Sequence, residues 1–215
     1  MIAIFPYQNL LYLACESGNI ESVKRYASQF DINGFVSIGH DYSTPLIVAC
    51  RYGHVEVVKL LIELGAYVNW KTPYCNTALH TACMNNQEEI VQILLKCHNI
   101  NVNYNGMHYT CLHSVCKWGY KTMCKLLLDH PKIDVTICNK YGQTAFDLAV
   151  SESRFDIIKM MIWKNADSEN ILDSIWKRLV EKERDDKRRV INLHLVWPHT
   201  KFPMELERML MDMLR

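Results

Sequence analysis

The sequence predicts an all-α solenoid in which a unit of one β-turn and two antiparallel helices is repeated about five times. Three observations support this: a threonine-led segment recurs at nearly constant spacing, a pair of small residues follows most copies, and an apolar helical pattern comes next. The threonines are 33, 33 and 34 residues apart, at Thr44, Thr77, Thr110 and Thr144. A supersecondary unit that recurs at a fixed period of this length is the signature of a stacked repeat protein.

Each threonine opens a tetrad that begins the first helix of a unit. The tetrads are Thr44-Pro45-Leu46-Ile47, Thr77-Ala78-Leu79-His80, Thr110-Cys111-Leu112-His113 and Thr144-Ala145-Phe146-Asp147. A threonine here accepts from backbone N–H groups of the first turn, and Pro45 takes a position where a missing N–H costs nothing. The pairs that follow indicate close helix packing: Ala49-Cys50, Ala82-Cys83, Val115-Cys116 and Ala149-Val150.

Second helices are predicted over 55–63, 88–96, 121–129 and 155–163, with apolar residues at i, i+3 and i+4. Gly65 is expected to end one of them in the left-handed conformation. Asn86 replaces the corner glycine of the third unit, and Ser153 that of the fifth, where we expect looser packing. A degenerate first copy covers 11–24, and the longer stretch 34–41 is expected to bulge.

These residues resemble the ankyrin-repeat family, whose unit is a β-turn plus two antiparallel helices with a Thr-Pro-Leu-His signature. The resemblance covers roughly residues 8–162. We assign 5–163 to an ankyrin-repeat domain and 164–215 to a capping helix with an amphipathic extension. The resemblance implies a non-catalytic module or scaffold that binds another protein through a concave groove, which is formed by the finger tips and the inner helix faces.

Composition limits the classes of function. The chain is 49% hydrophobic and 22% charged, which is typical of a globular protein. A net charge of +1 offers no whole-chain electrostatic argument for nucleic acid or for an anionic membrane. Neither a signal peptide nor an apolar span of about twenty residues is present in the sequence. The nine cysteines are therefore expected as free thiols in a reducing compartment, the cytoplasm or alternatively the nucleus.

Several cysteines and a histidine have spacings that suggest zinc: Cys111, His113, Cys116, Cys124 and Cys138. However, His113 takes the tetrad position and Cys116 the small-residue position, where cysteine behaves as a small buried hydrophobe. No cysteine is singled out by a base and an orienting group, and no glycine-rich phosphate loop is present in the sequence. We expect no metal, no cofactor and no enzyme, and an enzyme or metal-binding protein is the remaining alternative.

The positions that the repeat leaves variable are predicted to face the groove. Aromatic residues and arginine dominate interface hot spots, and a large exposed apolar patch usually indicates a partner. The predicted partner-binding residues are Arg51, Tyr52, Tyr74, Met84, Met107, Tyr109, Lys117, Trp118, Lys140 and Tyr141. Their positive charges indicate a ligand with some acidic residues. The alternative is that some of these rings pack on neighbouring fingers.

Asn69 and Asn103 each follow a leucine by eight residues and a valine by one. The family resemblance implies that such asparagines can be hydroxylated by an oxygen-dependent asparaginyl hydroxylase. A turn-forming asparagine without modification is the alternative.

The tail departs from the repeats. A helix over about 170–189 is expected to cap the fifth unit with its apolar half. The last residues predict an amphipathic, methionine-rich helix that carries Leu206, Met209, Leu210 and Met213. This segment is similar to the opening of an F-box and to the end of a SOCS box, which implies a substrate adaptor of a cullin-type ubiquitin ligase as an alternative function. The chain is equally consistent with a piece of a larger polypeptide.

The adaptor alternative makes a testable prediction. A cullin adaptor subunit should be retained by the wild-type chain and lost on L206D/L210D, because the charges would disrupt the apolar helix face. A pull-down with the purified subunits measures this. Equal recovery of the adaptor subunit with both forms would contradict the adaptor alternative and favour a plain scaffold.

Overall fold

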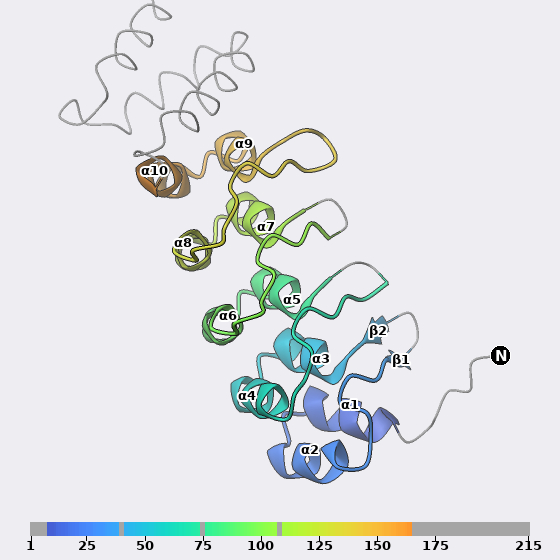
Figure 1. Ribbon diagram of the computed structural model, residues 1–215. Helices are drawn as coiled ribbons and strands as arrows, with labels where there is room; N and C mark the ends of the chain where they lie inside the picture. Colours follow the sequence, from blue (N-terminus) through green and yellow to red (C-terminus); the bar gives the residue numbers. More distant parts are fainter. Residues whose placement is uncertain (1–7, 39–40, 74–75, 107–108, 165–215) are drawn as a thin grey trace, which may run out of the picture.

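The computed structural model describes residues 8–38, 41–73, 76–106 and 109–164. Its helices form successive antiparallel pairs stacked in one direction (Figure 1). The inner row contains α1 Gln8–Glu16, α3 Pro45–Tyr52, α5 Ala78–Met84, α7 Cys111–Trp118 and α9 Ala145–Ser151. The outer row contains α2 Ile20–Ala27, α4 Val55–Glu63, α6 Glu88–Leu95, α8 Lys121–Leu128 and α10 Phe155–Lys164. The predicted solenoid of helix pairs is confirmed.

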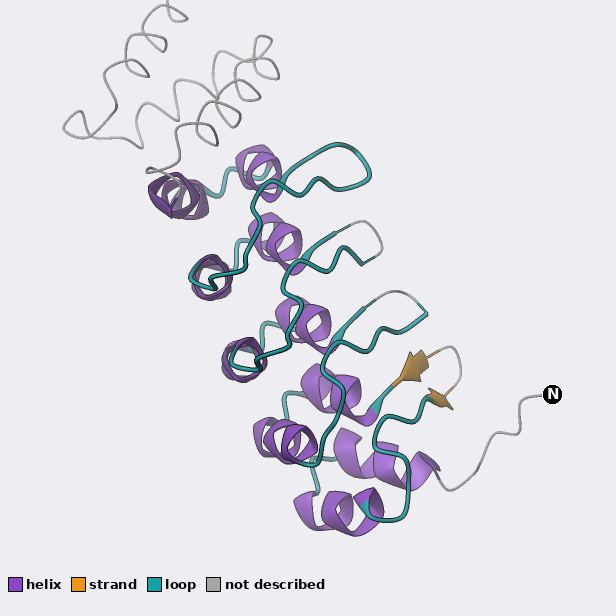
Figure 2. Ribbon diagram, viewed as in Figure 1, coloured by secondary structure: helices purple, strands orange, loops and turns teal. Residues whose placement is uncertain are grey.

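Finger-like loops join the units and project from one side of the stack (Figure 2). In the first finger, β1 Val36–Ile38 pairs antiparallel with β2 Asp41–Ser43, with Val36 opposite Ser43. The stretch 34–41, predicted to bulge, thus contributes instead to a small hairpin, drawn as two arrows in Figure 2. Isolated bridges join Gly106 to Tyr109 and Cys138 to Thr144 in later fingers.

The threonines begin the inner helices as predicted. Each Oγ1 accepts from the backbone N–H three residues on, at N···O distances of 3.2 to 3.4 Å, for Thr44, Thr77, Thr110 and Thr144. At the start of α7 and α9, the side chain three residues after the threonine also accepts a hydrogen bond from the threonine N–H. The acceptors are Nδ1 of His113 at 3.2 Å and Oδ2 of Asp147 at 2.7 Å. These reciprocal capping boxes satisfy two backbone donors that the helix itself leaves unpaired.

Two inner helices, α5 and α7, are each connected to the finger of the next unit by one histidine. Nε2 of His80 donates to the carbonyl of Tyr109, and Nε2 of His113 to that of Gln143, both at 3.0 Å. Nδ1 of each ring meets the Oγ1 of its own capping threonine. Since the carbonyl must accept, the proton lies on Nε2 and Nδ1 remains the acceptor. The histidine therefore bonds within and between units, as the tetrad position predicts.

The corners between helices require left-handed backbone. Gly53 has φ 79° and Gly119 has φ 81°, and Asn86 follows with 57° and Ser153 with 54°. At the last corner, Nε of Arg154 donates to the carbonyl of Lys117 at 3.3 Å. The ring of His54 makes the equivalent contact with the carbonyl of Glu16 at 2.7 Å. Arg154 thus takes the position of this histidine, and the looser packing expected at Ser153 stays a prediction.

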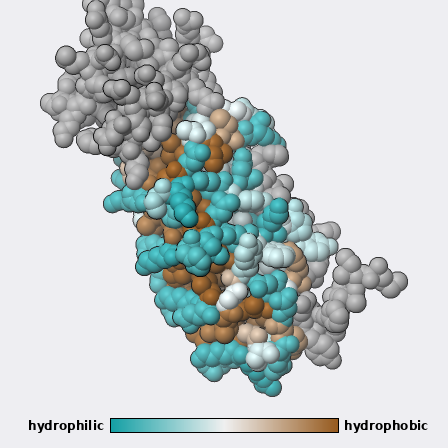
Figure 3. Space-filling view, viewed as in Figure 1, coloured by the Kyte–Doolittle hydropathy of each residue, from teal (hydrophilic) through white to brown (hydrophobic). Residues whose placement is uncertain are grey.

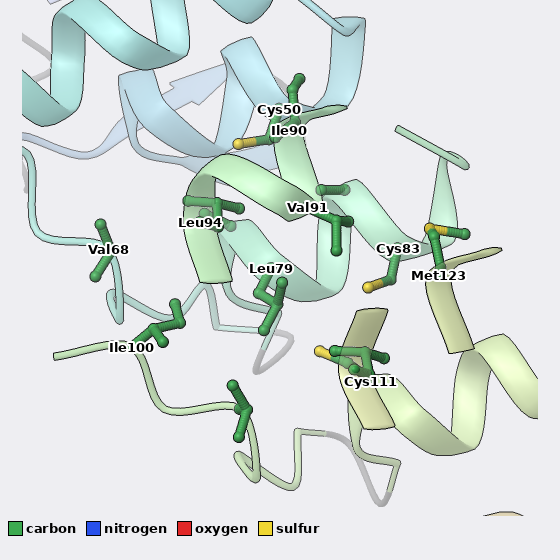
Figure 4. Packing of buried hydrophobic residues seen from close by; sticks show 14 of the residues in the cluster. Cys50, Val68, Leu79, Cys83, Ile90, Val91, Leu94, Ile100, Cys111 and Met123 are labelled. Atoms are coloured by element: carbon green, nitrogen blue, oxygen red, sulfur yellow. The ribbon is translucent and has the colours of Figure 1, made fainter. Parts of the chain in front are cut away.

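The apolar core runs along the stack between the two rows of helices. Figure 3 shows hydrophobic residues gathered along its length, with hydrophilic residues on both sides. Cys50, Cys83 and Cys116 are fully buried in the small-residue position, as predicted. Figure 4 shows Cys83 and Cys111 among buried hydrophobic side chains such as Leu79 and Val91. Sγ of Cys116 lies 4.0 Å from Sγ of Cys124, so these sulfurs are packing atoms of the core.

The buried histidines predict a loss of stability in mild acid. Burial lowers the pKa of His80 and of His113 below the ordinary value of 6.5, although the carbonyls that accept from Nε2 partly oppose this. The unfolded chain then binds more protons than the folded one, so the free energy of unfolding should fall as pH drops below about 6.5. Urea unfolding followed by circular dichroism between pH 7.5 and 5.5 measures the slope.

The matched variant is H80Q/H113Q, because glutamine at the third helical position preserves the capping box without titrating. Its slope should be clearly flatter than that of the wild type. A small slope should remain, since burial and Lys132 also lower the pKa of His130. An unchanged slope in the double variant would assign the acid sensitivity to other groups.

The buried thiols predict selective alkylation. Burial raises the pKa of Cys15 to about 12, and it likewise raises that of Cys50. Among the eight cysteines that the structure describes, iodoacetamide should modify the half-buried Cys97 and Cys138 first in the native chain, because reaction needs an accessible thiolate. The six buried thiols should react only in denaturant: Cys15, Cys50, Cys83, Cys111, Cys116 and Cys124. Peptide mapping would contradict this if a buried thiol reacted as fast as Cys138.

Candidate protein-binding surface

Large side chains stand exposed at the ends of three consecutive inner helices. Tyr52, Met84 and Trp118 are the last residues of α3, α5 and α7, and they are 47%, 51% and 57% exposed. A left-handed residue follows each of them within two positions, at Gly53, Asn86 and Gly119, so no further helical turn covers these ends. We call Tyr52, Met84 and Trp118, together with Arg51, Lys117, Lys140 and Tyr141, the inner-helix surface.

Tyr52 is held at the junction of the first two units. Its hydroxyl donates to Oε1 of Glu16 at 2.7 Å, and its ring stacks on His54 with centroids 6.4 Å apart. Nη2 of the adjacent Arg51 donates to Oγ of Ser43 at 3.1 Å. These contacts orient the tyrosine ring while nearly half of the side chain remains in water.

Lys117 lies between two rings. Its Nζ is 5.9 Å from the ring centroid of Tyr109 and 5.9 Å from that of Trp118, within the range of cation–π attraction. Tyr109 is half-buried and packs edge-to-face against His113. Tyr109 thus agrees with the alternative that some rings pack on neighbouring elements. In the last finger, Nζ of Lys140 lies 5.0 Å from the ring centroid of the exposed Tyr141.

Lysines of the outer helices and lysines of the inner-helix surface have different partners. On the outer row, Lys59 pairs with Glu56 at 2.6 Å and Lys121 pairs with Asp156 at 3.1 Å. Within the described part of the chain, Lys117 and Lys140 have no carboxylate within ion-pair distance and contact aromatic rings instead. At Lys117 and Lys140, the inner-helix surface therefore combines exposed rings with positive charge that no described carboxylate pairs.

Some predicted residues cannot be placed on this surface. Tyr74 and Met107, and likewise Leu206, Met209, Leu210 and Met213, lie outside the described residues. Their roles in partner binding and in the adaptor alternative stay predictions.

Asn69 and Asn103 connect the loops of successive units. Nδ2 of Asn69 donates to the carbonyl of Asn99 at 2.6 Å, and its Oδ1 accepts from the N–H of Asn101 at 2.9 Å. Asn103 repeats this pattern one unit later, with Lys132 and Asp134. Both amide atoms thus serve the turn, as the unmodified alternative requires. A hydroxylase would need to open this loop to reach the side chain, so modification stays a prediction.

A second exposed aromatic cluster was not anticipated from the repeat pattern. It contains Phe35, Tyr67 and Trp70, which lie in the loops after α2 and α4. Alternation of buried and exposed residues along the chain predicts part of this cluster. Ala66 and Val68 are buried, so the intervening Tyr67 must point away from the core. No local pattern indicates that Phe35 lies beside Trp70.

The described side chains offer little to a catalytic interpretation. His80 and His113 are committed to helix caps, and burial raises the pKa of the core thiols. Among the described residues, no group of three or more His, Cys, Asp or Glu side chains could hold a metal ion. Over the same residues, no helix is long and apolar enough to span a membrane.

Comparisons with known proteins agree with this architecture. A model of ankyrin repeats in three copies matches residues 10–106, and a second model of ankyrin repeats in many copies matches residues 112–162. An ankyrin repeat protein of fowlpox virus (strain NVSL) is 34% identical over 164 residues, which cover 72% of this chain and 47% of the viral protein.

Two mouse proteins match shorter parts of the chain. The protein fem-1 homolog A-like is 35% identical over 40% of this chain and 13% of its own length. The protein phosphatase 1 regulatory subunit 12A is 37% identical over 34% of this chain and 7% of its own length. The matched region thus spans about half of the viral relative and small parts of the mouse proteins. From its repeats, its helix pairs and these matches, the chain belongs to the ankyrin-repeat family.

Proposed function

We propose that this chain is a non-catalytic interaction module that binds a protein partner through its inner-helix surface. Membership of the ankyrin-repeat family supports the coarser part of the proposal, since ankyrin repeats are in general protein-interaction units built as extended binding surfaces. The observation that carries the finer part is the exposure of Tyr52, Met84 and Trp118, which are the last residues of three successive inner helices.

The chemistry of the surface favours a partner segment with both apolar and acidic side chains. Tyr, Trp and Arg are the residue types enriched in binding hot spots. Nζ of Lys117 lies 5.9 Å from the ring centroid of Trp118, and Nζ of Lys140 lies 5.0 Å from that of Tyr141. A carboxylate of the partner can therefore bind the ammonium group while its neighbouring apolar atoms cover the ring, without desolvating an existing ion pair.

A binding role also fits how the reactive groups are used. His80 and His113 are buried in capping hydrogen bonds, and core thiols such as Cys15 and Cys111 are protonated at neutral pH because burial raises their pKa. One relative is by its name a regulatory subunit of a phosphatase, which is a role played through a partner. Free thiols of this kind are in keeping with a reducing compartment such as the cytoplasm.

The proposal predicts that Y52A/W118A abolishes partner binding while the chain stays folded. Truncating one hot-spot ring costs about 2 kcal/mol or more, so the double variant should lose well over tenfold in affinity. Affinity capture followed by mass spectrometry identifies the partners that the wild type retains and the variant does not. Titration with a partner identified in this way then measures the loss.

The matched control is L13A/L64A, because both leucines are 48% exposed and neither belongs to the inner-helix surface. This control should retain the partners of the wild type. Thermal unfolding of all three forms separates lost contacts from lost structure. Retained affinity in a folded Y52A/W118A would refute the assignment of the surface.

A further inference from the structure

A cavity of about 500 Å³ lies between two consecutive loops on the stack. One wall comes from the loop after α4, with Tyr67, Trp70 and Lys71, and the other from the loop after α6, with Asn101 and Tyr104. We call this cavity the loop pocket. Its volume is in the range of small ligand sites, which is about 300–1,000 Å³. None of these residues belongs to the inner-helix surface.

The aromatic walls are fixed before any ligand arrives. Trp70 packs edge-on against Phe35, with centroids 5.1 Å apart, and against Tyr67, with centroids 6.2 Å apart. Tyr104 packs perpendicular to His80 at 5.8 Å, a ring that is itself fixed by two hydrogen bonds. Tyr67 and Trp70 nevertheless remain exposed. Rings held in this way lose little conformational entropy when a ligand covers them.

The asparagine side chains make the loops of the pocket rigid. Asn69 bonds to the backbone of Asn99 and of Asn101 through both ends of its amide. Oδ1 of Asn101 accepts from the N–H of Asn103 at 3.1 Å. Among the described residues, Nδ2 of Asn101 has no protein acceptor and is a donor that a ligand can use. Two adjacent units thus present one preformed surface.

The charge of the loop pocket selects the sign of the ligand. Of the lining residues that the structure describes, Lys71 alone is charged, and its Nζ lies 5.9 Å from the ring centroid of Tyr104. Aromatic pockets often attract cations, but here an ammonium group already occupies the face of a ring. A second cation would be repelled. The complementary ligand therefore carries an anionic group beside a flat or apolar group.

A carboxylate fits the loop pocket better than a phosphate. One lysine balances the single charge of a carboxylate, whereas a nucleotide brings more charge and usually meets several cations, a helix N-terminus or a glycine-rich loop. The described lining contains none of these. We propose that the loop pocket binds a short segment of a partner protein in which an aromatic side chain is flanked by a carboxylate. The ring lies against Trp70 and Tyr104, and the carboxylate binds Lys71.

The test uses capped tripeptides and the full chain. The ¹⁵N-labelled chain is titrated with Glu-Phe-Glu, and the indole N–H signal of Trp70, assigned by its loss in W70F, reports occupancy. The signal should shift in a saturable manner. Lys-Phe-Lys and Glu-Ala-Glu should leave it unchanged, because the first reverses the charge and the second lacks the ring.

Variants then assign the contacts. K71Q should weaken the acidic peptide roughly tenfold, the loss expected of one charge-assisted hydrogen bond, and K71R should restore binding. Y104A should remove the shift while leaving the thermal unfolding of the chain close to that of the wild type. Y52A/W118A should bind the peptide normally, which separates this site from the inner-helix surface.

Three results would overturn the proposal. The first is no saturable shift with Glu-Phe-Glu, and the second is equal binding of Lys-Phe-Lys. The third is binding of adenosine monophosphate in preference to the acidic peptide, which would identify a nucleotide site instead.

Discussion

A pair of helices this short cannot remove its own apolar face from water, and the rest of the structure depends on that constraint. Each unit must bury its face against the next, so small side chains recur between units, such as those of Cys50, Cys83 and Cys116. The same constraint explains why the hydrogen bonds that matter most run between units. His80 and His113 each connect one inner helix to the following finger.

Residues that hold the stack together and residues that are exposed for binding occupy different positions of the repeat. The threonine caps, the buried cysteines and the left-handed corners serve packing and backbone hydrogen bonding, and they leave few polar atoms for other chemistry. The ends of the inner helices are less constrained, although the hydroxyl of Tyr52 still bonds to Glu16 of the preceding unit. Met84 and Trp118 are more than half exposed, and residues at such positions, not the fold, determine which partner a repeat protein binds.

Much of this architecture follows from local physics that is visible in the chain itself. The period, the capping threonines and the left-handed Asn86 were all predicted correctly, since helix capping and corner conformation depend on neighbours within a few residues. Contacts with a neighbouring unit were not predicted. Arg154, beside the left-handed Ser153, reaches back to the carbonyl of Lys117 in the preceding unit, 37 residues away. Tyr109 was predicted to face the groove, but its ring is half-buried and packs on His113 of the same unit.

The loop pocket shows most clearly what could not be predicted from the sequence. Its walls come from loops about one period apart, joined by hydrogen bonds such as that from Asn69 to Asn99 across 30 residues. The sequence by itself determined the repeat unit, the number of units and the residue types left over for binding, because each depends on short-range periodicity. Only the tertiary structure decided which rings are packed, which stand in water and which meet across neighbouring units. The reason is that exposure and charge complementarity depend on which residues the stacking of units brings together.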